Sequence, residues 1–568
     1  MPQDAYTLRY LCEELKSIFS GGKINKIVQP NNDELVFTVY TGKRTEKLLL
    51  SVNPASPRMG IIHEEKESPL TAPNFCMLMR KHLLSATIDK ITLVGFDRIV
   101  RIDLTASAEF FDAVKKSVFV ELMGRYSNII LTENGKILGG NRGINMFDNG
   151  VRPLIVGRPY VFPPVQDKKL PDDESLIEYF SNFNGEDLAG YLCDGIQGIA
   201  TSTANDIVDA FFDNGSGFFE QNKAKDFYLH LKNYLYFGNK QPCVTIDDGT
   251  VKDVMVHPYK KAKGELKFFN YLYQAEEYYF VERERTKRFI TKKERLNAIV
   301  NTAIKKAKKR LSAICSKEKE ACGAEENRIK GELLLSNLYR IKSGESKVTL
   351  DNYYDGTTVE IVLDERLSVS KNAEQYYKKY NKQKRTLVAL KPQKENAERE
   401  LDYLVSVADE IALSESIDEL ALVQKELESA DLIKEQKLPT RKKSVETFCR
   451  EYEVGGFKVK AGRNNAENDK LTFTAKPCDI WLHAKDYHST HTVIYTEGKT
   501  VPEKVLVAVA EITAYYSKGR EGGKTEIVYT EKKNVKKPPK SKPGFVTYDN
   551  FKSLSVLPEK HSEFLING

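Results

Sequence analysis

The sequence lacks the features that mark several common classes of protein. Its eight cysteines are scattered and form no CxxC pair, which argues against a zinc ribbon, thioredoxin-type redox chemistry and a disulfide framework. No window approaches the roughly 18 consecutive apolar residues that a membrane span requires, and the N-terminus lacks the basic-then-apolar layout of a signal peptide. We therefore expect a cytoplasmic protein that contacts no membrane.

Sequence motifs of the common enzyme classes are also missing. No GxGxxG, GxSxG or HExxH occurs, and the Walker-like stretch at 517–525 lacks its first glycine. His483, Asp486, His488 and His491 lie close enough in the sequence for a folded loop to bring them to one metal ion. Histidines on strands and loops more often contact phosphates, partners or the core. We expect no catalytic residue, no metal and no cofactor.

The charge of the 568-residue chain is unevenly distributed. Eighty-seven Lys and Arg against 80 Asp and Glu give a formal charge of +7. Residues 441–568 carry this whole excess, because residues 1–440 hold 64 residues of each sign. A basic unit on a neutral body is typical of a nucleic-acid contact, although solubility alone could also explain a charge this small.

Hydrophobic patterns divide the chain into four parts, as expected for a multidomain α+β protein with about 150 residues per domain. Residues 1–172 mix helix and strand patterns and predict an α+β domain. Residues 173–272 predict a mainly helical domain, and residues 273–435 are rich in Lys, Glu, Leu and Ala. Residues 441–568 predict a second α+β domain with strands around one helix.

The segment 196–207 has the layout of a helix-hairpin-helix. In that motif, a turn of small residues lets backbone N–H groups at a helix start approach a phosphate. Ala200 occupies the position where a second glycine is usual. A tight turn between two helices that binds no nucleic acid explains the pattern equally well.

Residues 273–435 predict an antiparallel coiled-coil arm. Apolar residues recur every three or four positions in two stretches, which are Leu296, Val300, Ala303, Ala307, Leu311 and Ile314, and then Leu387, Leu390, Ala397, Leu401, Leu404, Ala408 and Ile411. A β-hairpin pattern with Asp355-Gly356 as its turn separates them, so the arm should carry a small β tip at about 341–370. Pro392 should kink or restart the second helix.

The last domain contains the residue types that bind RNA. Amide and guanidinium donors, one tryptophan and a lysine run on a proline-rich loop suit RNA binding through the backbone, the 2′-OH and base stacking. The candidate RNA-binding residues are Arg463, Asn464, Asn465, Trp481, His483, Lys485, His491, Lys532, Lys533, Lys536 and Lys537. The alternative is a buried tryptophan in a domain that binds nothing.

In the first domain, Asp97 and Arg98 interrupt two apolar runs, and a salt-bridged strand corner is their simplest explanation.

The order of these parts and several motifs resemble the bacterial branch of the NFACT family over nearly the whole chain. The motifs are GRNNAEND, DIWLHAKD, NVKKPPKSKPGFVTY, YYDGTTVEIVLDERLSVSKNAEQYYKKYNK and the Asp97-Arg98 pair. The resemblance implies an NFACT-N domain related in fold to formamidopyrimidine-DNA glycosylases. It also implies a helix-hairpin-helix domain, a coiled-coil arm and an RNA-binding NFACT-R domain.

The resemblance further implies a role in ribosome-associated quality control. Such a protein binds a large ribosomal subunit that is obstructed by a peptidyl-tRNA nascent chain complex. It recruits alanine tRNA for template-free alanine tailing, while the ribosome performs peptide transfer. Asp97 and Arg98 match the family pair implicated in tRNA recruitment. Tyr353 and Tyr354 at the arm tip are expected to contact the ribosome, and a small RNA-binding co-factor protein could take part.

Two other functions are weighed against this role. An older family name, fibronectin-binding protein, suggests a surface adhesin that binds fibronectin, but the missing signal peptide, anchor and disulfides disfavour it. A DNA-repair glycosylase on the same N-terminal fold would use Pro2 as an amino-terminal nucleophile. The next residue is Gln3 instead of the acid that this chemistry favours, and no zinc finger is present.

Overall fold

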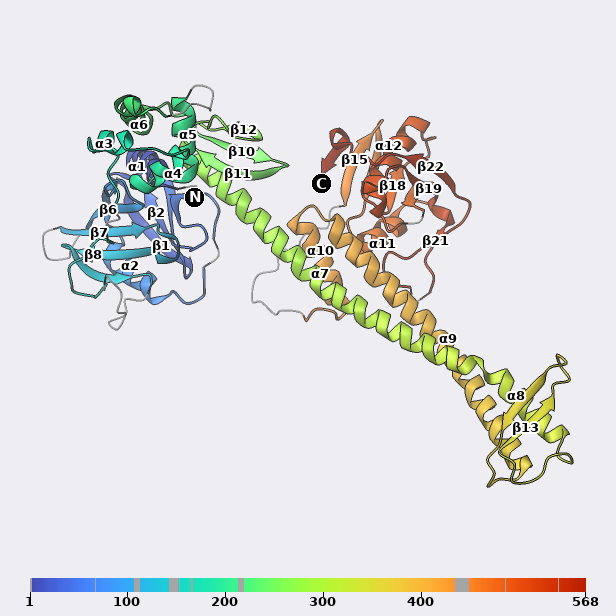
Figure 1. Cartoon of the computed structure of the whole chain (residues 1–568). Coiled ribbons are helices and arrows are strands. Elements are labelled where there is room, and N and C mark those ends of the chain that lie inside the picture. The colour runs from blue at the N-terminus through green and yellow to red at the C-terminus, as the bar shows by residue number, and fades with distance from the viewer. Residues whose placement is uncertain are drawn as a thin grey trace. The chain divides into compact units, whose positions relative to one another are not determined.

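The computed structural model describes residues 3–66, 68–106, 113–142, 152, 154–164, 167–212, 219–434, 449–485, 487–539 and 541–567. The chain folds into two compact units, Met1–Thr286 and Lys287–Gly568 (Figure 1). The linker expected around residue 440 lies outside the described residues. In the described part of the chain, no helix combines the length and the hydrophobicity that crossing a bilayer needs.

A nine-stranded antiparallel sheet forms the first domain, in the order β4-β3-β2-β1-β5-β6-β7-β8-β9. Its strands are β1 (Lys23–Asn31), β2 (Glu34–Tyr40), β3 (Thr45–Ser51), β4 (Arg58–Ile61), β5 (Thr87–Leu93), β6 (Ile99–Ala106), β7 (Val114–Glu121), β8 (Asn128–Glu133) and β9 (Lys136–Gly140). Helices α1 (Ala5–Phe19) and α2 (Asn74–Leu83) join its core. Leu8, Leu11 and Leu15 of α1 lie one turn apart and are fully buried, because that spacing places them on one face.

The second part of unit 1 is mainly helical, as predicted. Its helices are α3 (Leu176–Ser181), α4 (Leu188–Gly195), α5 (Thr201–Phe211) and α6 (Ala224–Phe237), with a short 3₁₀ turn η2 (Gln221–Lys223). A three-stranded sheet follows, formed by β10 (Cys243–Asp247), β11 (Thr250–Met255) and β12 (Glu265–Phe268). Tyr6 of α1 packs its ring 5.5 Å from that of Tyr234 in α6. Both parts therefore share one hydrophobic core.

Two long helices form the arm, as the apolar stripes predict. They are α7 (Leu272–Cys322) and α9 (Val369–Leu413), and α10 (Ile417–Ser429) packs beside their base (Figure 1). The seam of the three helices buries Leu296, Val300, Ala307, Leu404, Val407, Ile411, Leu420, Val423 and Leu427. Further along the arm, Ile314 packs against Leu390 and Ala397.

Of the two effects predicted for Pro392, a kink or a restart of the helix, the restart does not occur. The helix α9 runs without a break from Val369 to Leu413 and contains Pro392 in its interior. Proline costs a helix about 3 kcal/mol because it lacks a backbone donor and crowds the preceding turn. Leu390 and Ala397 on either side of Pro392 both pack against Ile314, and this seam keeps the helix continuous.

The arm ends in a small β tip, as predicted. Helix α8 (Ala324–Ser336) leads into the hairpin of β13 (Lys347–Asp351) and β14 (Thr358–Val362). Gly356 adopts a positive φ of 72°, a conformation that glycine tolerates without strain. The backbone N–H and the hydroxyl of Thr357 both donate to the Asp355 carboxylate, which closes the turn. The prediction that Asp355 and Gly356 form the turn of the hairpin is thus confirmed.

The last domain is a seven-stranded sheet in the order β22-β19-β17-β18-β16-β15-β23. Its strands are β15 (Arg450–Val454), β16 (Phe457–Ala461), β17 (Ile480–Ala484), β18 (Thr492–Tyr495), β19 (Thr525–Glu531), β22 (Lys552–Val556) and β23 (Leu565–Asn567). A small hairpin pairs β20 (Val535–Lys536) with β21 (Thr547–Tyr548). Helix α12 (Glu503–Tyr515) packs into the larger of the domain's two cores, and α11 (Asn465–Thr474) belongs to the core around Trp481.

Candidate nucleic-acid interface

The Asp97-Arg98 pair lies in the turn between β5 and β6 and is half-buried. The Asp97 carboxylate accepts hydrogen bonds from the backbone N–H of Arg98, at 2.7 Å, and from the side-chain amide of Gln197, at 3.1 Å. A Cβ atom on Gly198 would lie 2.2 Å from the Phe96 carbonyl oxygen, so only glycine permits this approach. The tRNA-recruiting loop expected from the sequence is therefore held against the turn that joins α4 and α5.

In the turn between α4 and α5, the backbone N–H of Ala200 is not free to bind a phosphate. The Asp4 carboxylate accepts from the backbone N–H of Ala200 at 3.1 Å and from the hydroxyl of Thr203 at 2.7 Å. Its other oxygen accepts from the backbone N–H of Thr7 and caps α1. An internal carboxylate thus occupies the position that a phosphate takes at a helix start. This geometry favours the tight structural turn over phosphate binding by the Ala200 amide.

A groove beside the Asp97 loop carries cationic side chains. It has a volume of about 470 Å³, and its charged lining residues are the cations Arg9, Lys16 and Lys90 and the acids Glu13 and Asp172. The Arg9 guanidinium lies 4.2 Å from the ring centre of Tyr236, a cation–π geometry. Lys16 and Lys90 are exposed at the rim. Cations next to Asp97-Arg98 suit the phosphates of a bound nucleic acid.

The side chains of the 463–465 loop, predicted to bind RNA, make hydrogen bonds inside the protein. The Arg463 guanidinium donates to the Glu467 carboxylate, and the Asn464 side chain caps α11 through the backbone N–H of Glu467. The Asn465 amide donates to the Ser406 hydroxyl at 3.1 Å and to Glu426 at 3.2 Å. The loop therefore attaches the last domain to the arm base.

Trp481, predicted as a platform for base stacking, has no exposed ring face in the structure. Trp481 is 0% exposed and packs with Val493, Val528 and Val535 in the core between the sheet and α11. The imidazole of His483 stacks parallel to the indole at 5.6 Å, with its Nδ1 buried. Burial lowers the pKa of His483 to about 4, so its ring is neutral near pH 7. Trp481 lies on the inner strand β17 of the sheet. Because both faces of this strand are covered, its indole belongs to the core.

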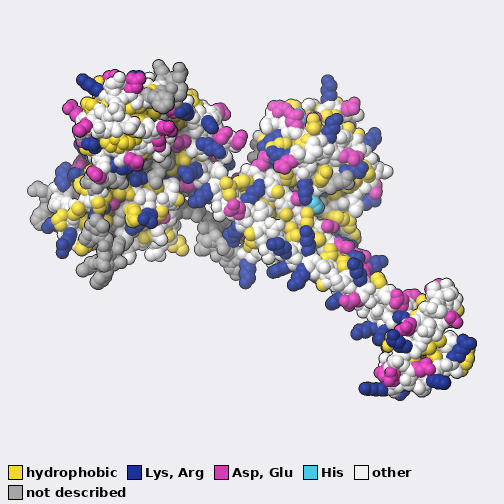
Figure 2. Space-filling model, in the orientation of Figure 1, with side chains coloured by type: hydrophobic (Ala, Val, Ile, Leu, Met, Phe, Trp, Pro, Cys, Tyr) yellow, Lys and Arg dark blue, Asp and Glu magenta, His cyan; other side chains and the backbone are white. Residues whose placement is uncertain are grey.

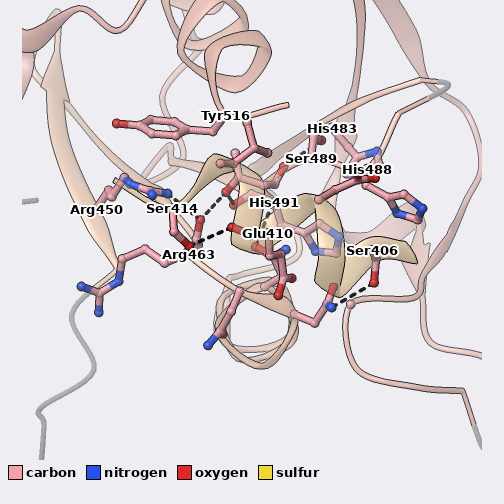
Figure 3. Close-up of a pocket in the computed structure, with 18 residues that line it drawn as sticks. Ser406, Glu410, Ser414, Arg450, Arg463, His483, His488, Ser489, His491 and Tyr516 are labelled. Atoms are coloured by element: carbon pink, nitrogen blue, oxygen red, sulfur yellow. Dashed lines mark hydrogen bonds between the residues drawn. The ribbon is translucent and has the colours of Figure 1, made fainter. Parts of the chain in front are cut away.

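His491 is equally unsuited to direct RNA contact. It is 1% exposed, and its Nδ1 lies 2.7 Å from the Thr472 hydroxyl. Burial holds the pKa of His491 well below its ordinary value. Arg463, Asn464, Asn465, His483 and His491 nevertheless converge, because all of them line one pocket of about 60 Å³ between the arm base and the last domain (Figure 3).

The acidic wall of this pocket comes from the arm. Burial and the neighbouring Glu426 carboxylate raise the pKa of Glu410 well above its ordinary value, and burial likewise raises the pKa of Glu426. The Asn465 side chain donates to the Ser406 hydroxyl, and the Asn465 backbone donates to Glu410. These hydrogen bonds join the last domain to the arm (Figure 3). The pocket is small, and its polar side chains are mostly hydrogen-bonded to one another. We therefore interpret it as a polar contact that holds the last domain on the arm.

The predicted lysines do form a surface. Lys533, Lys536 and Lys537 are exposed along the 3₁₀ turn η4 (Lys532–Asn534) and β20. Lys533 pairs with Glu531, Lys537 pairs with Asp469, and Lys536 lies 3.8 Å from Asp549. Lys485 is set apart from them and bridges to Glu526 at 3.1 Å.

Exposed phenylalanines accompany these lysines, and the sequence reasoning missed them. Phe473 is 38%, Phe545 53% and Phe551 45% exposed. The Lys532 ammonium lies 5.5 Å from the ring centre of Phe473. Lysines beside exposed aromatic rings form a surface that binds phosphates and stacks on bases. The signal for two of them is present in KPGFVTYDNFK, where phenylalanines follow the lysine run.

The histidines considered as zinc ligands do not form such a group in the described residues, and Asp486 lies outside them. In the described ranges, the one set of potential ligands within reach of a single ion is Glu511, Glu559 and His561. Both His561 nitrogens lie at hydrogen-bond distance from carboxylates, Nε2 2.7 Å from Glu511 and Nδ1 2.9 Å from Glu563. These contacts of His561 with carboxylates account for the cluster.

The predicted ribosome contact lies at the end of the arm. Tyr353 and Tyr354 are 56% and 51% exposed, with their ring centres 4.7 Å apart. The Tyr354 hydroxyl donates to Glu332 at 2.9 Å, and Arg328 lies over its ring. The tip thus presents two ordered aromatic side chains to solvent.

Comparison with known proteins identifies the family. Residues 4–446 match the family model described as NFACT N-terminal and middle domains, and residues 446–550 match the NFACT protein RNA binding domain. The chain belongs to the NFACT family. The protein named Rqc2 homolog RqcH from Bacillus subtilis (strain 168) is 30% identical over 97% of this chain and 96% of its own. The protein of the same name from Streptococcus pneumoniae (serotype 2, strain D39) is 31% identical over 98% of both chains.

A more distant NFACT relative is archaeal. It is named Archaeal Rqc2 homolog aRqcH, comes from Methanocaldococcus jannaschii, and is 26% identical over 89% of this chain and 80% of its own.

In the present NFACT protein, Gln3 is a packing residue. Its side-chain amide donates to the Met59 carbonyl and to Glu276, and its oxygen accepts from the Met59 N–H. The residue that follows Pro2 is thus fully engaged inside the domain.

Proposed function

We propose that this NFACT protein is a ribosome-associated quality-control factor. It binds the large ribosomal subunit obstructed by peptidyl-tRNA and recruits alanine tRNA for template-free tailing of the stalled chain. The observation that carries this proposal is identity of about 30% over nearly the full length to proteins named Rqc2 homolog RqcH. The exposed arm tip, the lysine surface and the cationic groove beside Asp97-Arg98 support it.

In this proposal the protein positions tRNA and the ribosome performs peptide transfer. The groove residues Arg9, Lys16 and Lys90 would hold tRNA phosphates next to the Arg98 guanidinium. The lysine and phenylalanine surface of the last domain would hold a second stretch of RNA. Holding two reactants close together replaces a bimolecular encounter with a favourable geometry, which needs no nucleophile from this chain.

Removing the arm-tip tyrosines is expected to weaken ribosome binding. Exposed, ordered aromatic side chains contribute about 2 kcal/mol each when they act as hot spots of an interface, which corresponds to about 30-fold in affinity. Tyr353→Ala with Tyr354→Ala should therefore reduce co-sedimentation with purified large subunits. The matched control is Tyr40→Ala with Tyr271→Ala, two tyrosines of unit 1 that are 46% and 51% exposed. Equal sedimentation of both variants would exclude the tip as an anchor.

The lysine surface should determine the salt dependence of RNA binding. Each phosphate contact contributes about 0.7 to 0.9 to the slope of log affinity against log salt. Lys532→Gln, Lys533→Gln and Lys536→Gln together should make this slope shallower by about 2 to 3 for full-length protein titrated with tRNA. A triple control removes the exposed lysines Lys499, Lys504 and Lys524 of the same domain. The prediction fails if the two triple variants show the same slope.

A further inference from the structure

The charge balance of residues 1–440 conceals a strongly basic segment in the middle of the arm. We call this segment the shaft and define it as residues 301–330 and 375–405. The shaft holds 17 Lys and Arg against 8 Asp and Glu, a net charge of +9 that exceeds the +7 of the whole chain. Residues 301–317 and 375–394 contain 13 of these cations and no acidic residue.

The two basic stretches follow one another along the arm. Arg310 pairs with Glu400 at 3.0 Å, and Asn327 donates to Gln383 at 2.7 Å, so the α7 stretch lies nearer the base and the α9 stretch nearer the tip. At about 1.5 Å per residue, they cover on the order of 55 Å of the arm. Lys and Arg side chains follow the arm between its tip and the last domain (Figure 2).

Most of these cations have no acidic partner. Within the described residues, five of the 17 form ion pairs, namely Arg310, Arg328, Lys378, Lys394 and Arg399. Lys305, Lys306, Lys308 and Lys309 are all exposed, because Ala307 between them is the residue that faces the seam. Repulsion between such neighbours opposes folding, so the arrangement calls for an anionic partner.

The chemistry of the shaft favours one class of partner. A helix that lies on a membrane needs an exposed apolar face, whereas the apolar stripes of α7 and α9 are buried against each other. A protein interface needs an apolar core, yet Val388 is the one large hydrophobic side chain of the described shaft that is mainly exposed. Long rows of cations without apolar residues between them suit a phosphate backbone.

We propose that the shaft binds the phosphate backbone of RNA. This inference deepens the proposed function and rests on it, since it assigns RNA contact to the arm in addition to the last domain. The shaft would hold the arm along an RNA helix by charge alone, and the tip tyrosines would provide the specific contact. RNA sequence would have little influence on the shaft, because phosphate contacts position a protein without reading bases.

The test uses the full-length chain and two probes, a 20-base-pair RNA duplex and purified large ribosomal subunits. The shaft variant carries Lys305→Gln, Lys306→Gln, Lys308→Gln and Lys309→Gln, and glutamine matches lysine in helix propensity. The control variant carries Gln at Lys23, Lys26, Lys43 and Lys225, four exposed lysines of unit 1. Thermal melting should be unchanged in both. We expect the shaft variant to lower the duplex salt slope by about 2 to 4, and the control variant to keep the parent slope.

The two probes separate failure of this inference from failure of the proposed function. Equal duplex slopes for the shaft and control variants overturn the inference, whatever the subunits show. If the shaft variant loses subunit binding but keeps duplex binding, the shaft contacts ribosomal protein, and the inference is again overturned. If the parent binds the duplex through the shaft but does not bind subunits, the inference holds and the proposed ribosomal role fails.

Discussion

Replacing Asp97 and Arg98 by alanine is expected to remove tRNA from ribosome-bound protein. A guanidinium presents a planar pair of donors that fits a phosphate or a guanine edge. Loss of one charge-assisted contact costs about 1.5 to 3 kcal/mol, roughly 10- to 150-fold in affinity. The variant should still sediment with large subunits through the arm, yet carry far less tRNA and support no alanine tailing.

The internal contacts of Asp97 predict a small additional cost in stability. Its carboxylate accepts two hydrogen bonds within unit 1, from Arg98 and from Gln197. Each bond contributes about 0.5 to 1.5 kcal/mol, so the melting temperature should fall by only a few degrees. Gln197→Ala provides the control, because it removes one internal bond and leaves Asp97 and Arg98 in place. Equal tRNA per ribosome-bound protein in the double variant and the parent would contradict the recruiting role.

Replacing Glu419 should destabilise the last domain, or its attachment to the arm, more than the substitution of any surface residue. Glu419 on α10 pairs with Arg450 on β15, and both side chains are more than nine-tenths buried. Arg450 also lies 3.9 Å from the ring centre of Tyr516. Glu419→Ala leaves a buried guanidinium without its carboxylate, which costs about 3 to 5 kcal/mol. Asp418→Ala, at an exposed position one residue earlier, should cost less than about 1 kcal/mol.

The single tryptophan makes this effect measurable in the full-length protein. Trp481 is fully buried in the last domain, so its fluorescence reports the unfolding of that domain in urea. A second variant, Glu419→Leu with Arg450→Met, removes both charges and should recover most of the lost stability. An unchanged urea midpoint for Glu419→Ala would show that the pair does not stabilise the joint.

Local sequence patterns were sufficient for the arm and its tip. The apolar stripes from Leu296 to Ile314 and from Leu390 to Ile411 predicted the two helices because packing along one seam needs that spacing. Asp355-Gly356 predicted the tip turn because glycine accepts a positive φ. Pro392 does not restart the helix, since tertiary packing on both sides outweighed a local preference.

The RNA surface was less predictable because residue type does not specify the direction of a side chain. Asn464 and Asn465 look like RNA-binding amides in sequence, yet they cap α11 and attach the domain to Ser406 and Glu426. Trp481 sits on a strand whose two faces are both covered, which only the sheet order reveals. The basic shaft was missed for a different reason, because a net charge summed over residues 1–440 hides its separation into basic and acidic parts.

The most direct test of the account is the RNA that the protein carries in cells. The tagged full-length chain is purified from its own cells at moderate salt, and the co-purifying RNA is sequenced beside that of the Asp97→Ala, Arg98→Ala variant. The account predicts large-subunit ribosomal RNA with both proteins, and alanine tRNA enriched with the parent alone. Recovery of neither RNA with the parent would contradict a role on the large ribosomal subunit.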